Sequence, residues 1–166
     1  MSFQGVIEKM RDEDLLAHFR EVKCKGQDSS GFNFFDFLHA HGSPLDALFY
    51  SRLFWPEFVE INGMVFLKET IEDDDDRGRL DEALERYDGD KTKTEQSFNL
   101  TEIPSLFGKN LAETSDEEDL VLAERLAEMW QHRLQIIYPN RKFTVQLLSA
   151  EETGGEAGVI FYTERA

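Results

Sequence analysis

The sequence has only one cysteine, no long apolar run and few basic residues. Cys24, alone among 166 residues, cannot form a disulfide within one chain, so no covalent cross-link stabilises the fold. No apolar stretch is as long as the run of about 18 residues that a membrane-spanning helix needs. The charged run from Glu8 to Asp14 leaves no room for the apolar segment of a secretory signal. We therefore expect a cytoplasmic protein that does not enter a membrane.

The shortage of basic residues limits the partners that the protein can have. The chain has 18 Lys and Arg residues against 34 Asp and Glu residues, a formal net charge of −16. A protein this acidic repels phosphate backbones and lacks a basic stripe, so we expect no direct binding of nucleic acid. Its 40% hydrophobic residues are nevertheless enough for a folded core, and its length predicts a single globular domain over residues 1–166.

Helix-capping residues and apolar spacing predict four or five helices. Ser43 and Pro44 form the clearest start signal, because Ser accepts from free amides of the first turn and Pro loses no bond there. Ser115 and Glu118 fit a capping box ahead of a long apolar stripe. The expected helices lie near residues 12–26, 33–42, 43–55, 80–87 and 115–138.

Two β-hairpins are predicted as well. The dipeptide Asn62-Gly63 tolerates the positive φ angles of a type I′ turn, and apolar residues flank it on both sides. A second pair of strands is expected near residues 143–147 and 159–162. About four short antiparallel strands, with helices packed mainly on one face, predict an α+β fold.

Two segments of this expected domain have unusual composition. Residues 89–114 are mostly polar, which predicts a long mobile loop within the domain. Ten of the 20 aromatic residues lie between residues 32 and 66, and we expect this segment to form the core.

Most of the negative charge lies in two short segments. Residues 72–90 carry 3 − 10 = −7 and residues 113–128 carry 1 − 7 = −6. If the two segments are neighbours, they form one negative surface that can steer a basic protein partner. A protein that binds such a partner would be an inhibitor, an immunity-type antidote or an adaptor. The competing explanation is that the negative charge serves only to keep the protein in solution. The expected partner-binding residues are Asp73, Asp74, Asp75, Asp76, Asp81, Glu82, Glu85, Asp116, Glu117 and Glu124.

No convincing catalytic set is visible, since the chain has neither a G-x-S-x-G elbow nor a phosphate-binding loop. We therefore expect no catalytic residues and no cofactor. One alternative is a metal-dependent hydrolase, because Asp36, His39 and His41 lie within six residues and such side chains bind zinc or iron. Those histidines can equally well end a helix. A second alternative is a nucleic-acid mimic, whose carboxylates would imitate phosphates towards a nucleic-acid-binding protein.

Overall fold

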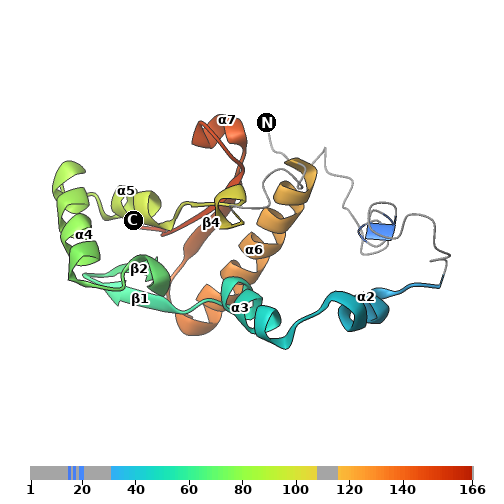
Figure 1. The fold of residues 1–166 in the computed structure, drawn as a ribbon. Helices are drawn as coiled ribbons and strands as arrows, with labels where there is room; N and C mark the ends of the chain where they lie inside the picture. Colours follow the sequence, from blue (N-terminus) through green and yellow to red (C-terminus); the bar gives the residue numbers. More distant parts are fainter. Residues whose placement is uncertain (1–14, 16, 18, 21–30, 108–115, 166) are drawn as a thin grey trace. The chain divides into compact units, whose positions relative to one another are not determined.

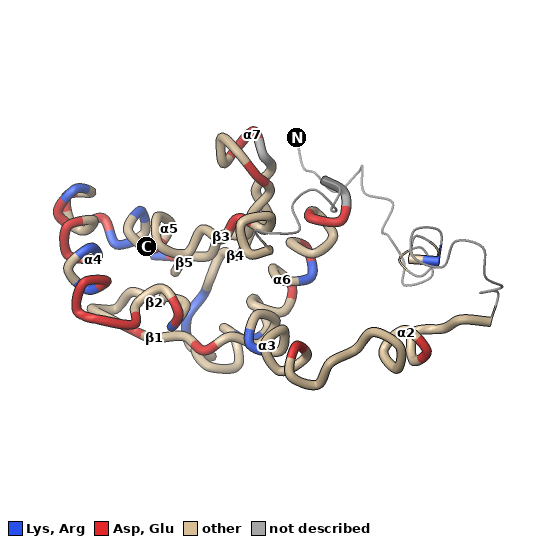
Figure 2. The backbone as a smooth tube through the Cα atoms, in the orientation of Figure 1, with Lys and Arg blue, Asp and Glu red and all other residues tan. Residues whose placement is uncertain are grey.

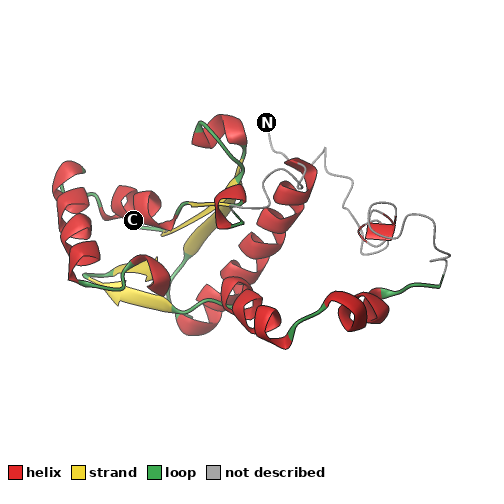
Figure 3. Ribbon diagram, viewed as in Figure 1, coloured by secondary structure: helices red, strands yellow, loops and turns green. Residues whose placement is uncertain are grey.

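The computed structural model describes residues 15, 17, 19–20, 31–107 and 116–165. The chain divides into two compact units, Met1–Phe49 and Tyr50–Ala166. The single globular domain over residues 1–166 stays a prediction. Helices are combined with two antiparallel sheets, so the predicted α+β class is confirmed (Figure 1, Figure 3). Among the described residues, no helix has the length and apolar character needed to cross a bilayer.

Helix α2 (Phe34–His41) begins and ends where the sequence predicts. The Asn33 side chain accepts hydrogen bonds from the first turn, and the Asp36 carboxylate accepts one from the Asn33 amide at 2.9 Å. This capping box satisfies amides that a helix leaves unpaired. Gly42 follows the last turn. The predicted helix near residues 12–26 lies mostly outside the described residues.

Helix α3 (Pro44–Phe54) also begins at its predicted signal. The Ser43 hydroxyl accepts a hydrogen bond from the Asp46 amide at 3.3 Å, and Pro44 occupies the first helical position. Near the other end, Leu53 and Phe54 pack against the hydrophobic core of the unit Tyr50–Ala166.

Strands β1 (Phe58–Ile61) and β2 (Met64–Leu67) form the first predicted hairpin. Asn62 and Gly63 have φ angles of 53° and 79°, the left-handed values that a type I′ turn requires at both central positions. Every residue of β2 is buried, whereas β1 is only partly covered. The prediction from the Asn-Gly dipeptide is confirmed.

Helices α4 (Asp74–Arg86) and α5 (Lys91–Asn99) follow the hairpin. The Asp90 carboxylate starts α5 by accepting from two amides, at 3.0 and 3.1 Å. The polar composition of residues 89–114 predicts a long loop, and this prediction does not hold for α5. The helix escapes recognition because the residues that it buries are polar and show no apolar periodicity: Thr94, Glu95 and Asn99.

The second sheet has three strands in the order β3-β5-β4. Strands β4 (Phe143–Leu148) and β5 (Gly158–Thr163) pair antiparallel as predicted. Strand β3 (Thr101–Glu102) pairs with the other edge of β5 and is a fifth strand that the sequence did not reveal. Short helices complete the described elements: η1 (Lys68–Thr70), η2 (Pro104–Leu106) and α7 (Ala150–Thr153).

Helix α6 (Asp116–Ile137) supplies the largest part of the core. Its apolar stripe packs against the second sheet, as the sequence predicts, and Trp130 meets the ring of Phe161 edge-on at 6.0 Å between centroids. The Trp130 Nε1 atom donates a hydrogen bond of 2.8 Å to the carbonyl of Leu53. An indole that is both buried and hydrogen-bonded fixes α6 against α3.

Only the last part of the aromatic segment 32–66 belongs to the core that its composition predicts. Of its ten aromatic side chains, only Phe66 is buried. Phe34, Phe35 and Phe49 are 54%, 77% and 66% exposed. The prediction is wrong because composition counts aromatic residues but does not show which helix face they occupy or what covers that face.

Two buried polar side chains of α5 join the two sheets. The Glu95 carboxylate accepts hydrogen bonds from the amides of Val65 in β2 and Thr163 in β5, at 2.7 and 2.8 Å. Asn99 donates to carbonyls of the same two strands, at 2.8 and 3.3 Å. Arg165 balances the Glu95 charge at 2.7 Å. These side chains therefore supply the hydrogen bonds that a neighbouring strand would otherwise make.

Candidate functional site

Helix α4 carries the larger of the two predicted acidic segments. The Asp73 carboxylate accepts from the Asp76 amide at 2.9 Å, and the Asp76 carboxylate accepts from the Asp73 amide at 3.3 Å. This reciprocal pair fixes the first turn. The sequence thus uses two of its predicted binding residues to begin the helix.

The hydrogen bonds at Asp76 also affect its ionisation. The backbone amide of Glu72 donates to the Asp76 carboxylate at 2.8 Å, and this bond, together with the Arg79 guanidinium, lowers the pKa of Asp76 from its usual value. Asp76 is therefore a charged capping group engaged within its own helix. We assign Asp73 and Asp76 to helix capping rather than to partner binding.

Five other carboxylate-bearing residues of α4 lie on its outer side, and one of them, Glu82, also lines a cleft beside the helix. Leu80 and Ala83 are buried and define the inner side of the helix. At about 100° per residue, the five carboxylate-bearing residues on the opposite side fall within an arc of about 120° around the helix axis, and no basic residue lies within this arc. All five of its carboxylate-bearing residues are exposed. We call this set the α4 acidic face: Asp74, Asp75, Asp81, Glu82 and Glu85.

The second acidic segment does not join this face. Helix α6 lies well away from α4, with α5 and strands of the second sheet between them (Figure 1), and Figure 2 shows their acidic residues in separate places. Glu124 is half-buried on α6. The side chains of Asp116 and Glu117 lie outside the described residues. The prediction that the two segments form one continuous surface is therefore wrong.

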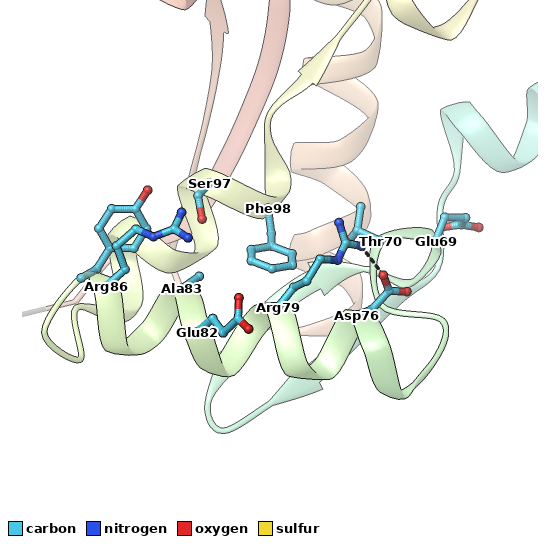
Figure 4. Close-up of a pocket in the computed structure, with 10 residues that line it drawn as sticks. Glu69, Thr70, Asp76, Arg79, Glu82, Ala83, Arg86, Ser97 and Phe98 are labelled. Atoms are coloured by element: carbon cyan, nitrogen blue, oxygen red, sulfur yellow. Dashed lines mark hydrogen bonds and ion pairs between the residues drawn. The ribbon is translucent and has the colours of Figure 1, made fainter.

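Two arginines of α4, Arg79 and Arg86, lie at the margin of the acidic face, beside a cleft of about 500 Å³. In Figure 4 the side chains of Arg79 and Arg86 lie on either side of the Phe98 ring, with Glu82 at the edge of the same cleft. Arg79 forms an ion pair with Asp76. Because both signs of charge line the cleft, it suits contacts with polar protein side chains better than a phosphate ligand.

This cleft has no clear signal in the sequence. Its lining comes from η1, α4 and α5, and the last of these helices carries no apolar pattern. The spacing of Arg79 and Arg86, seven residues apart on one helix side, was the available signal. That spacing alone is typical of any solvated helix, because it does not reveal that Phe98 of α5 lies beside the two arginines.

The alternative metal-binding residues are not grouped around a common point. Within the described part of the chain, no three His, Cys, Asp or Glu side chains are close enough to hold a metal ion. The Asp36 carboxylate caps α2, and the His41 ring packs edge-on against Phe19 at 5.0 Å. His39 is exposed in the last turn of the helix. The arrangement matches histidines that end a helix.

Comparison with known proteins finds no matching family model, no similar curated protein and no similar solved structure.

Proposed function

We propose that this protein binds a basic protein partner through the α4 acidic face. The proposal rests on one observation: five exposed carboxylates share the outer side of α4, and no basic residue interrupts them. An interaction role of this kind fits an inhibitor, an immunity-type antidote or an adaptor. It needs only one of the two acidic segments, so it does not depend on their being neighbours.

Concentrated like charge favours a binding role because it has an energetic cost. Carboxylates one turn apart repel one another, and a helix needs no such concentration to remain in solution. A cationic surface placed on this face relieves the repulsion and is attracted from a distance. The main effect is on the rate of association, since exposed charges steer encounter more than they add affinity.

The test compares two variants that lose the same number of negative charges. The first replaces three members of the α4 acidic face, as Asp81→Asn, Glu82→Gln and Glu85→Gln. The matched control neutralises three exposed carboxylates outside α4, as Glu128→Gln, Glu151→Gln and Glu164→Gln. Each immobilised protein is used to capture partners, and any captured protein is purified and its association rate is measured.

The proposal predicts a basic partner whose association with the wild type slows by about tenfold between about 50 and 300 mM salt. At low salt, the association rate of the α4 variant should be lower than that of the wild type by a similar factor, whereas the association rate of the control should fall much less. Equal binding by the two variants contradicts the proposal. So does an association rate that salt leaves unchanged, or the absence of any partner that depends on α4.

A further inference from the structure

The cleft beside α4 and the α4 acidic face have one residue in common. Glu82 belongs to the acidic face, and it also lines the cleft of about 500 Å³. All residues that line the cleft belong to the unit Tyr50–Ala166. A partner that is seated on the acidic face is therefore within reach of the cleft, whose volume is typical of pockets that enclose a bound group.

The cleft contains an aromatic ring that is only partly covered. The Phe98 ring is half-buried and meets the Phe66 ring edge-on, with 5.7 Å between the two centroids. This contact with a buried residue of β2 holds the Phe98 ring in place, while part of the ring stays accessible. A second aromatic ring placed against Phe98 buries apolar area and can adopt the offset or edge-to-face geometry that aromatic pairs prefer.

Charged side chains surround the accessible part of this ring. Among the cleft residues drawn in Figure 4, the only ion pair joins Arg79 to Asp76. The exposed side chains of Arg86 and Glu82 therefore remain available to a bound group. A guanidinium is attracted to the face of an aromatic ring, and a carboxylate accepts a hydrogen bond from an N–H or O–H group at the edge of such a ring.

We propose that the cleft receives a tryptophan or tyrosine side chain of the basic partner. This inference rests on the proposed function, because it takes the partner to be seated on the α4 acidic face. The inserted ring packs against Phe98 and under the Arg86 guanidinium, and its N–H or O–H group donates to the Glu82 carboxylate. An aliphatic side chain gains neither of the last two contacts, and the two arginines repel an inserted cation.

The acidic face and the cleft then have different roles in binding. The carboxylates of the face attract the partner from a distance and set the association rate. The cleft holds one aromatic residue, whose burial slows dissociation. Tryptophan and tyrosine are among the residues that most often dominate the binding energy of a protein interface. Affinity should therefore depend on one aromatic residue of the partner as well as on its positive charge.

The probes for this inference are short lysine-rich peptides that differ only in their central residue, which is Trp, Leu or Ala. Each peptide carries a dye and is titrated with the full chain at about 50 mM salt, where charge attraction is only weakly screened. Fluorescence anisotropy gives the three dissociation constants. The Trp peptide should bind about tenfold more tightly than the Ala peptide and about threefold more tightly than the Leu peptide.

A variant that fills the cleft locates the binding of the aromatic residue. Ser97 is exposed and lines the cleft, so Ser97→Trp should reduce the preference for the Trp peptide over the Ala peptide to less than about twofold. The matched control is Ser105→Trp, the same change at an exposed residue of η2 that does not line the cleft. It should keep the preference. Far-UV circular dichroism establishes that each variant remains folded.

Removal of one arginine separates the cation–π contact from charge in general. Arg86→Gln makes the chain more acidic, so all three peptides should bind more tightly, but the preference for Trp over Leu should be lost. The matched control is Arg77→Gln, which changes the charge by the same amount on the same helix at a residue that does not line the cleft. It should tighten binding of all three peptides and keep the preference.

Asp81→Asn combined with Glu85→Gln tests the acidic face separately, because neither residue lines the cleft. In this double variant all three affinities should fall together, and the preference for Trp should remain. If the wild type binds the three peptides equally and the double variant binds them more weakly, the inference is overturned and the proposed function stands. A Trp peptide that does not bind, or a preference that Ser97→Trp leaves unchanged, overturns the inference as well. Affinities that the double variant does not change contradict the proposed function itself.

Discussion

The two compact units differ in how far their apolar side chains are buried. In Tyr50–Ala166, side chains as large as Trp130, Phe66 and Phe161 are almost wholly inaccessible to solvent. In the described part of Met1–Phe49, no side chain is buried, and Phe35 is 77% exposed. Both units nevertheless have well-capped helices. The helix-capping signals are therefore equally clear in the two units, whereas the burial of apolar side chains differs between them.

This difference also shows in what each unit presents to solvent. The described part of Met1–Phe49 exposes large apolar side chains such as Phe35 and Phe49. The unit Tyr50–Ala166 presents charge, concentrated on the α4 acidic face. Exposed apolar residues are ordinary on a protein surface, whereas five carboxylates on one side of a helix are not.

The largest predicted effect compares one buried aromatic residue with one exposed aromatic residue. Trp130→Ala should lower the free energy of unfolding by about 3–5 kcal/mol, because it leaves a cavity against the second sheet. Phe35→Ala should change the same quantity by no more than about 0.5 kcal/mol in dilute protein. Urea denaturation followed by circular dichroism measures both values. Similar losses in the two variants would remove the distinction between the units.

An intermediate effect is expected where α5 joins the sheets. Glu95→Gln replaces one acceptor oxygen by an NH₂ group that faces backbone donors, so the variant should lose about 2–3 kcal/mol of unfolding free energy. Glu85→Gln makes the same chemical change at an exposed position and should lose almost none. Urea denaturation compares the two variants. A small loss at Glu95 would contradict the buried hydrogen bonds described for it.

The smallest effect concerns pH. The folded state lowers the pKa of Asp76, chiefly through the Glu72 amide and then through Arg79. The carboxylate therefore stabilises the fold above its usual pKa of 3.8 and loses that contribution as pH falls through the lowered value. Asp76→Asn keeps an acceptor oxygen but does not titrate, so its melting temperature should fall less steeply between about pH 4 and 2. Identical slopes in the variant and the wild type would contradict this assignment.

Features encoded by neighbouring residues were predictable from the sequence. The Asn62-Gly63 turn, the Ser43-Pro44 start of α3 and the stripe of α6 each depend on residues within a few positions of one another. Such signals survive in the folded protein because the backbone geometry that they favour is local. The same reasoning identified the carboxylates of α4, although it could not tell capping residues from outward-facing ones.

Features that depend on distant contacts were not predictable. Helix α5 buries Glu95 because Val65 and Thr163, 30 and 68 residues away, present amides to it. The separation of α4 from the acidic turns of α6 is a property of the tertiary arrangement (Figure 1). Likewise, Phe34 and Phe35 are 54% and 77% exposed although they lie in a well-capped helix. Composition contains no information about any of these contacts.

Native-state hydrogen exchange tests the contrast between the units most directly. Amides of β4, β5 and α6, whose side chains form the core, should exchange slowly, whereas those of α2, which has no buried side chain, should exchange much faster. Equally slow exchange in α2 and in the core elements would contradict the account.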